Sequence, residues 1–351
     1  MRQLCLVFTL SLATLAPAAL AQEGPYKILK TEKVGGDGGF DYVDADSAGR
    51  RLYIARGGPS RGEPGRITVF NLDTLKSEGE IPNASAHGAA VSTKTHHGFA
   101  TSKPVVMWDT KDLKTIKTID VQGGPDGILY EPFTDHVYIL SHSEPNVTVI
   151  NAADGSVAGT IDLGGAPEQA VSDDKGHVYI DLENRGSIAV VDAAKMQKTA
   201  TYSLEGKGDG CAGLALDAKN EILFAACREP QVMVILSAKD GKILTTLPIG
   251  QGCDGATFNP KTMEAFSSQR DGTLTIIKEK SPTDFEVEQN LKTMTMAKTL
   301  TLDSKTGHIF LIAAEYGPPP APPANPPQGG RGRGMRAPML PGSFTILEVG
   351  K

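Results

Sequence analysis

Four short apolar runs follow one another between residues 210 and 250, and polar turns separate them. The runs cover residues 214–216, 222–226, 232–236 and 243–249. Runs this short, rich in β-branched residues and interrupted by Gly, Pro and Asp, predict antiparallel strands. A lone four-stranded meander has two faces and cannot bury both. The pattern therefore predicts that this sheet stacks on copies of itself.

The same unit recurs along the chain. The second strand of each copy has an apolar or aromatic centre, at Tyr53, Phe99, Tyr138, Tyr179, Phe224, Ala265 and Phe310. These centres lie about forty residues apart, a repeat length typical of propeller blades. Seven copies predict an all-β fold, a seven-bladed β-propeller of four-stranded antiparallel blades. A closed ring leaves no end sheet uncovered, whereas an open array of such sheets would expose two.

The two ends of the chain complement each other. Residues 26–34 form one strand too many before the first copy, and the last copy lacks a fourth strand after residues 344–349. We therefore expect the N-terminal strand to complete the last blade and close the ring. On this interpretation residues 22–351 are a single propeller domain.

The loops predict two different faces. Turns at one face are tight, as at Asp154-Gly155, whereas loops at the other face are irregular, as at residues 57–65. Irregular loops on one face of a repeat array usually mark its binding face, here called the top face. Residues 317–342 are rich in Pro and Gly, and we expect a flexible loop in blade seven. This loop is either an exposed insertion or an arginine-bearing docking arm.

The first residues and the composition indicate an exported protein. Arg2, the apolar run 4–15 and Ala19-Leu20-Ala21 match a signal peptide over residues 1–21. The alternative, a membrane anchor, is disfavoured because the run is shorter than about 20 residues and Pro17 ends it. We therefore expect a periplasmic or secreted monomer with no membrane span after cleavage. A net charge of −6 without a basic stripe argues against nucleic acid as a partner.

Three cysteines remain after such cleavage. An oxidising compartment favours one disulfide and one free thiol. Cys211 and Cys227 lie at the same end of a predicted hairpin, which favours their pairing. Cys253 holds the position of Cys211 in the next blade and is the rival partner.

The strongest candidate site is the mouth of the central channel. The residues just before the inner strands align as Gly38, His87, Asp126, Glu168, Ala212, Asp254 and Ala297. The four ionisable side chains could converge on a polar ligand, or on Ca²⁺ or another divalent cation. The alternative is that they bond to the backbone of the adjacent blade and hold the ring closed.

A second ring of polar residues is expected where the second strands end. Its members are Arg56, Lys103, His142, Glu183, Arg228, Arg270 and Glu315. Three arginines among them, Arg56, Arg228 and Arg270, could clamp a carboxylate or phosphate. The alternative is ion pairing between blades. His97, His136, His177 and His308 instead open second strands at the opposite edge, so we expect no shared metal site among them.

The repeat at residues 127–171, GILYEPFTDHVYILSHSEPNVTVINAADGSVAGTIDLGGAPEQAV, resembles the YVTN-type repeat of bacterial seven-bladed propellers, the YncE-like family. CAGLALDAKNEILFAAC, PIGQGCDGATFNP and FSSQRDGTLTII are similar to a secreted bacterial subgroup, in which cysteines matching Cys211 and Cys227 recur. The resemblance implies a WD40/YVTN-like architecture and says little about activity, since such propellers serve as binders, lactonases, lyases and surface-layer modules.

Catalytic motifs are missing from the sequence. It contains no H-E-x-x-H or C-x-x-C motif, and no G-x-S-x-G or phosphate-binding glycine loop follows a predicted strand into a helix. We therefore expect a binding module that takes a small polar ligand or an envelope protein at the top face, with no organic cofactor. The alternative is a lactonase- or lyase-like enzyme that uses a cation and His87 or His142 at the channel mouth.

Overall fold

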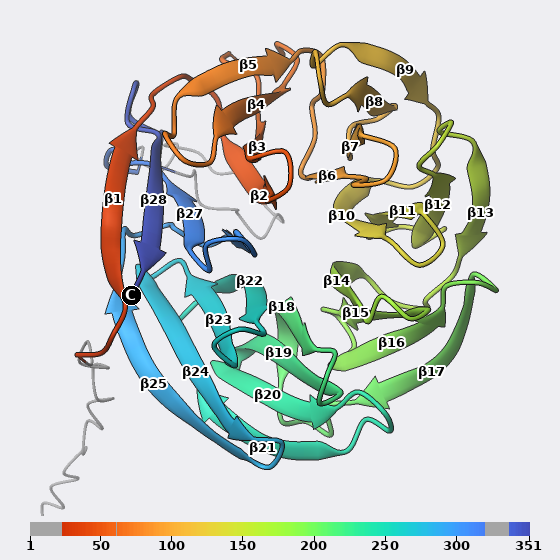
Figure 1. The fold of residues 1–351 in the computed structure, drawn as a ribbon, viewed down its shortest axis with the longest axis vertical. Helices are drawn as coiled ribbons and strands as arrows, with labels where there is room; N and C mark the ends of the chain where they lie inside the picture. The colour runs from red at the N-terminus through yellow and green to blue at the C-terminus, as the bar shows by residue number, and fades with distance from the viewer. Residues whose placement is uncertain (1–22, 61, 320–336) are drawn as a thin grey trace, which may run out of the picture.

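The computed structural model describes residues 23–60, 62–319 and 337–351, and they form seven four-stranded antiparallel sheets arranged in a ring (Figure 1). The predicted fold is confirmed. Every regular element of these residues is a strand, and none of them forms a helix long and apolar enough to cross a membrane. The expected signal peptide, residues 1–21, lies outside the described residues.

The first and second strands of each blade are the inner ones. The first strands, in blade order, are β2 (Phe40–Asp46), β6 (Ala89–Val91), β10 (Pro125–Glu131), β14 (Pro167–Ser172), β18 (Asp209–Asp217), β22 (Cys253–Asn259) and β26 (Leu300–Leu302). The second strands are β3 (Arg51–Arg56), β7 (His97–Ala100), β11 (His136–Ser141), β15 (His177–Leu182), β19 (Ile222–Glu229), β23 (Glu264–Gln269) and β27 (Ile309–Ala313).

The third and fourth strands lie farther from the axis. The third strands are β4 (Arg66–Asn71), β8 (Val105–Asp109), β12 (Val147–Asn151), β16 (Ser187–Asp192), β20 (Val232–Ser237), β24 (Thr273–Ser281) and β28 (Thr345–Gly350). The outer, fourth strands are β5 (Ser77–Ile81), β9 (Thr115–Ile119), β13 (Val157–Ile161), β17 (Gln197–Ser203), β21 (Ile243–Pro248), β25 (Asp284–Lys292) and β1 (Lys27–Lys33).

The apolar pattern of the strands places the core between the blades. Second strands such as β11 are buried on both faces, whereas outer strands such as β17 alternate between exposed and half-buried positions. One cluster joins blades one and two, where Tyr53 packs beside the fully buried Trp108. All the predicted strand centres lie on second strands. In blade six, however, the register makes Phe266 the equivalent of Tyr138, and Ala265 lies one residue before it.

The N-terminal strand closes the ring as predicted. β1 pairs antiparallel with β28, so that Lys33 lies opposite Thr345 and Lys27 opposite Gly350 (Figure 1). Beside this seam, Gln289 of blade six donates to the carbonyl of Tyr26 and accepts a hydrogen bond from its backbone nitrogen. These contacts tie the N-terminal end of the described chain to blade six.

The disulfide joins Cys211 and Cys227, as the hairpin favoured. The two residues lie directly opposite each other on β18 and β19. Cys253 keeps a free and fully buried thiol, and burial raises the pKa of this thiol to about 12.

The Pro- and Gly-rich loop predicted for residues 317–342 lies largely outside the described residues, which omit 320–336. Its described base is a short antiparallel contact in which Tyr316 bridges to Met339. The backbone nitrogen of Gly317 donates to Pro338, and that of Leu340 donates to Glu315.

Candidate functional site

One register position at the top of the inner strands carries an ionisable side chain in six of the seven blades. In blade order the residues are Asp41, His87, Asp126, Glu168, Ala212, Asp254 and Lys298. In each blade this position lies two residues before a first-strand residue that pairs with the second strand. Val43 pairs with Ile54 in blade one, and Leu300 pairs with Leu311 in blade seven. The expectation for blades one and seven was therefore wrong, because Asp41 and Lys298 occupy this position instead of Gly38 and Ala297.

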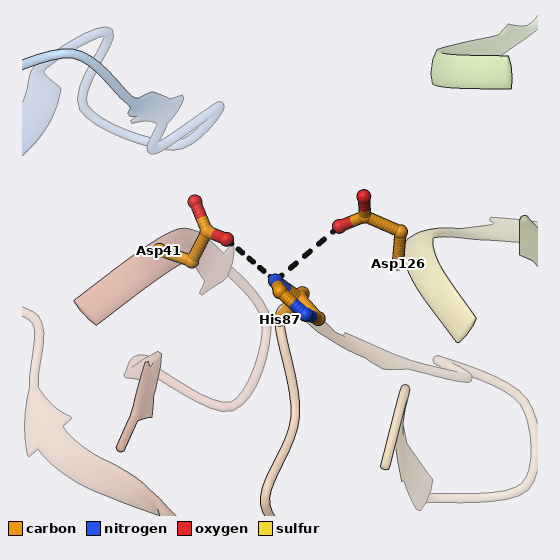
Figure 2. A group of neighbouring side chains, drawn as sticks. All are labelled: Asp41, His87 and Asp126. Atoms are coloured by element: carbon orange, nitrogen blue, oxygen red, sulfur yellow. Dashed lines mark hydrogen bonds and ion pairs between the residues drawn. The ribbon is translucent and has the colours of Figure 1, made fainter. Parts of the chain in front are cut away.

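His87 lies between two of these carboxylates (Figure 2). Its Nδ1 is 2.7 Å from Oδ2 of Asp41 and 3.4 Å from Oδ1 of Asp126. The three residues come from blades one, two and three, so the contact spans two blade junctions. The side chain of His87 is half exposed, which leaves the imidazole accessible from the top face.

His142 forms a second contact of the same kind on the other side of Asp126. Its Nε2 is 3.3 Å from Oδ2 of Asp126 and 2.9 Å from Oε2 of Glu168. The phenol of Tyr42 donates to the remaining oxygen of Glu168, Oε1, at 2.9 Å. Tyr42 belongs to blade one and Glu168 to blade four, so this hydrogen bond crosses the channel.

Asp41, His87 and Asp126 are here called the His87 triad, and Asp126, His142 and Glu168 the His142 triad. The contacts within each triad shift the pKa values of its members. Burial and the charge of Glu168 raise the pKa of Asp126 to about 6, although both imidazoles oppose this shift. The hydrogen bond to Glu168 raises the pKa of His142 to about 9, and the bond to Asp41 raises the pKa of His87. Burial alone would raise the pKa of Asp41, but His87 and Lys298 more than offset it and lower this pKa.

A cationic cluster occupies the opposite half of the mouth. The carboxylate of Asp254, almost fully buried, contacts Arg228, Arg270 and Lys298. Lys298 also lies 2.6 Å from Oδ1 of Asp41 and so joins this cluster to the His87 triad. Three cations already occupy the oxygens of Asp254. Ion pairing between blades therefore accounts for Arg228, which contacts Glu183 and Asp254, as the alternative expectation had it, whereas Arg270 pairs with Asp254 within blade six.

Arg56 lies apart from this network. It is 1% exposed, its guanidinium donates to the carbonyls of Gly36 and Gly38, and it lies 3.7 Å from the centroid of the Phe344 ring. In the register of the other blades Arg56 corresponds to Ser141, one residue before His142. A shift of one residue along a strand turns the side chain to the opposite face. Arg56 therefore points into the blade packing, where it supports the loop before β2.

The residues after the ring position form the floor of the mouth. In four blades this residue is Gly, and a Cβ on Gly213 would come within 2.7 Å of the backbone of Gly255. The inner strands thus approach too closely for side chains there. Gln169 crosses the axis, accepting from the backbone nitrogens of Leu214 and Ala256. Beneath the mouth remains a cavity of about 190 Å³, to which Tyr42 and Glu168 contribute.

Sequence reasoning found His87, Asp126, Glu168 and His142 but missed Asp41, Tyr42 and Lys298. The available signal was the spacing between the inner strand and the second strand, since Asp41 precedes Tyr53 by as many residues as Asp126 precedes Tyr138. The glycine-rich run before Phe40 obscured this spacing, because the run contains no apolar residue to mark where the inner strand of blade one begins.

The arrangement can bind a polar ligand in two ways. Carboxylates and imidazoles are hydrogen-bonding groups and ligands for divalent cations. Beside the mouth, a groove of about 1070 Å³ offers an apolar surface, with Arg270 at its edge and Phe40, Met294, Met296, Met339 and Leu340 among its lining residues. The top face therefore presents charged and apolar surfaces side by side.

Comparison with known proteins defines the class of the fold. The chain is similar to a solved structure of U3-55K, with a TM-score of 0.69 and 12% sequence identity over 92% of this chain and 98% of that one. It is similar to the RRP9 WD40 repeats, with a TM-score of 0.68 and 12% identity over 93% and 99%. A chain of the Mitotic Checkpoint Complex gives 0.68 and 12% over 89% and 95%.

These likenesses show the fold, a seven-bladed β-propeller like that of the RRP9 WD40 repeats. Because the identity is 12%, they concern the fold alone. Neither the protein-family models nor the curated proteins include a match to this sequence.

Proposed function

We propose that the protein is an exported β-propeller of the YVTN type that binds a small polar ligand at the top mouth of its channel. The observation that carries this proposal is the ring position itself, which holds ionisable side chains in six blades, together with the solvent-open imidazoles of His87 at this position and of His142 beside it. Ring closure alone does not require exposed imidazoles. The apolar first residues and the YVTN-like repeats support export to the periplasm or beyond. After cleavage of the signal peptide, the proposed mature protein has no membrane span.

A thermal-shift screen of purified protein, stripped of metal with EDTA, tests ligand binding. The panel contains small carboxylates, sugar phosphates, amines and lactones. A ligand at 100 times its Kd stabilises the protein by about 2.7 kcal/mol, which corresponds to a rise in Tm of roughly 5 °C for a chain of this size. We expect such a rise with wild type and its loss in Asp126→Asn.

Asp173→Asn is the matched control for this screen. Asp173 also contacts a histidine, His177, but at the bottom edge of blade four. A panel ligand that stabilises wild type, Asp126→Asn and Asp173→Asn equally would place binding elsewhere and overturn the proposal.

A lactonase or lyase is the second candidate function. The observation that favours it is the placement of His87 between Asp41 and Asp126, since a histidine held by a carboxylate is the usual geometry of a general base. Hydrolysis of a lactone panel by wild type and by His87→Ala tests this function. Equal or absent turnover in both proteins would eliminate it.

A further inference from the structure

The two histidine triads meet in a single carboxylate. Asp126 contacts His87 through Oδ1 and His142 through Oδ2, so each of its oxygens serves a different triad (Figure 2 shows the first). Within each triad, the potential ligand atoms lie within 4.8 Å of one another. Each triad offers one imidazole nitrogen and two carboxylate oxygens, a donor set that suits Zn²⁺ or Mn²⁺.

The spacing of these atoms matches metal coordination. Bonds of about 2.0–2.2 Å to a tetrahedral Zn²⁺ place neighbouring ligand atoms about 3.3–3.6 Å apart. The contacts of Asp126 with His87 and His142, at 3.4 and 3.3 Å, already have this spacing. The contacts of His87 with Asp41 and of His142 with Glu168, at 2.7 and 2.9 Å, need to lengthen by only about half an ångström.

Groups outside the triads orient the terminal carboxylates. Lys298 holds Oδ1 of Asp41, and the phenol of Tyr42 holds Oε1 of Glu168. Each carboxylate is thereby left with its other oxygen turned toward an imidazole. Hydrogen bonds from outside to the non-ligating atoms are the arrangement by which proteins fix metal ligands. Tyr42 and Lys298 come from blades one and seven, so the surrounding ring supports both triads.

We propose that the two triads are the halves of a dinuclear divalent-cation site in which the carboxylate of Asp126 bridges the ions. Asp41 and His87 complete one half, and His142 and Glu168 complete the other. Three protein ligands to each ion leave a coordination position toward the exposed top face. This inference rests on the proposed function and adds to it that an oxyanion or carbonyl ligand would bind to the two ions.

Isothermal titration of the EDTA-stripped full-length protein with Zn²⁺ alone, at neutral pH, tests the site. Wild type is expected to bind two ions. His87→Ala and His142→Ala are each expected to bind one, and Asp126→Asn to bind both at least tenfold more weakly. His177→Ala is the control and should bind two ions, because the pair of His177 and Asp173 has no third ligand among the residues that the structure describes.

Far-ultraviolet circular dichroism and Tm of each metal-free variant show whether it is folded.

Tyr42→Phe is a second probe of the cation site. It is expected to weaken only the ion held by His142 and Glu168, by about 10- to 100-fold. No Zn²⁺ uptake by wild type, or uptake that is unchanged in both histidine variants, would overturn the proposal. If wild type binds only one ion, and each histidine variant binds none, the bridged pair of ions would be overturned.

The outcome is separable from that of the ligand screen. A panel ligand that stabilises the stripped wild type, in a protein that takes up no Zn²⁺, would refute the cation site and leave the proposed function standing. Two ions that disappear as expected in the variants, with no panel ligand bound by either the stripped or the Zn²⁺-loaded protein, would do the reverse.

Discussion

At the scale of the residue, Asp254 carries the largest concentration of charge at the top face. Three cations contact this carboxylate, which is 5% exposed. Removing one partner of a buried ion pair leaves the other charges uncompensated in a poorly solvated place. Asp254 is therefore the residue of the mouth on which the stability of the ring depends most.

We predict that Asp254→Asn lowers the free energy of unfolding by about 3–5 kcal/mol, because Arg228, Arg270 and Lys298 then lose the buried carboxylate that all three contact. Urea denaturation followed by fluorescence measures the loss. Glu183→Gln is the control, since Glu183 pairs with Arg228 but is partly exposed, and it should cost less than about 1 kcal/mol. Equal losses in the two variants would contradict the prediction.

Glu279 introduces a pH dependence at the bottom face. Its Oε1 accepts a hydrogen bond from Asn220 at 2.7 Å, whereas its Oε2 is buried with no hydrogen-bond partner, and the same is true of Oδ2 of Asp217. Burial, followed by the charge of Asp217, raises the pKa of Glu279 to about 7. The folded state thus holds a proton on Glu279 that the unfolded state releases at a lower pH.

Because the folded pKa exceeds the unfolded one, Glu279 makes stability fall as pH rises from about 4.5 to about 7 and leaves it level above. We predict that Glu279→Gln matches wild type at pH 4.5 and exceeds it at pH 8 by up to about 3 kcal/mol. Thermal melts across this range are the measurement. Asp44, whose pKa burial also raises to about 7, should retain part of the slope. A variant less stable than wild type at pH 8 would refute the assignment.

At the scale of the element, the disulfide reinforces the first hairpin of blade five. It joins β18 to β19 across a sequence separation of 16 residues, and both sulfurs are buried. Closing a loop of this length stabilises a protein by about 3 kcal/mol in the chain-entropy account.

We predict that the double change Cys211→Ala with Cys227→Ala lowers the free energy of unfolding by about 3 kcal/mol. Urea unfolding with and without reductant measures it, and reductant should affect wild type but not the double variant. Cys253→Ala is the control, because its thiol forms no disulfide and the reductant effect should persist. A reductant effect that survives in the double variant would point to a different pairing.

The elements were predictable because each blade repeats the same apolar pattern. Second strands such as β11 are buried from their second residue on, so their centre, here residues 137–140, is continuously apolar and identifies the blade. The site depends on register, which the repeat specifies less strictly. Arg56 lies only one residue from the equivalent of His142, yet this difference turns it from the mouth into the packing. Contacts between distant residues, such as Tyr42 with Glu168, required the closed ring.

At the scale of the whole molecule, the ring is closed by exchanging one strand between the chain ends. β1 supplies the outer strand of a blade whose other three strands come from the C-terminal end. The β1–β28 hydrogen bonds thus join the two chain ends within one blade, whereas each of the other six blades takes its four strands from one continuous stretch of chain. The seam should therefore contribute to cooperative folding of all seven blades.

Circular permutation tests this contribution. With Lys351 joined to Glu23 through a short linker, opening the chain at Asp154-Gly155 makes β13 come from the new N-terminal end and recreates an interlocked blade. Opening it at Gly164-Gly165 leaves every blade continuous. We predict that the first permutant melts within a few degrees of wild type and the second melts well below it. The reverse order in calorimetry would contradict a stabilising role for the exchanged strand.

The direction of the strands at the seam also fixes how the molecule stands on a support. β28 ends, and β1 begins, at the bottom edge, where Lys27 lies opposite Gly350 and the side chain of Lys351 contacts Glu264. A tether attached to Lys351 therefore leaves from the side remote from the histidine triads. Immobilised by its C-terminus on a sensor chip or a bead, the propeller would present its mouth outward to whatever flows past.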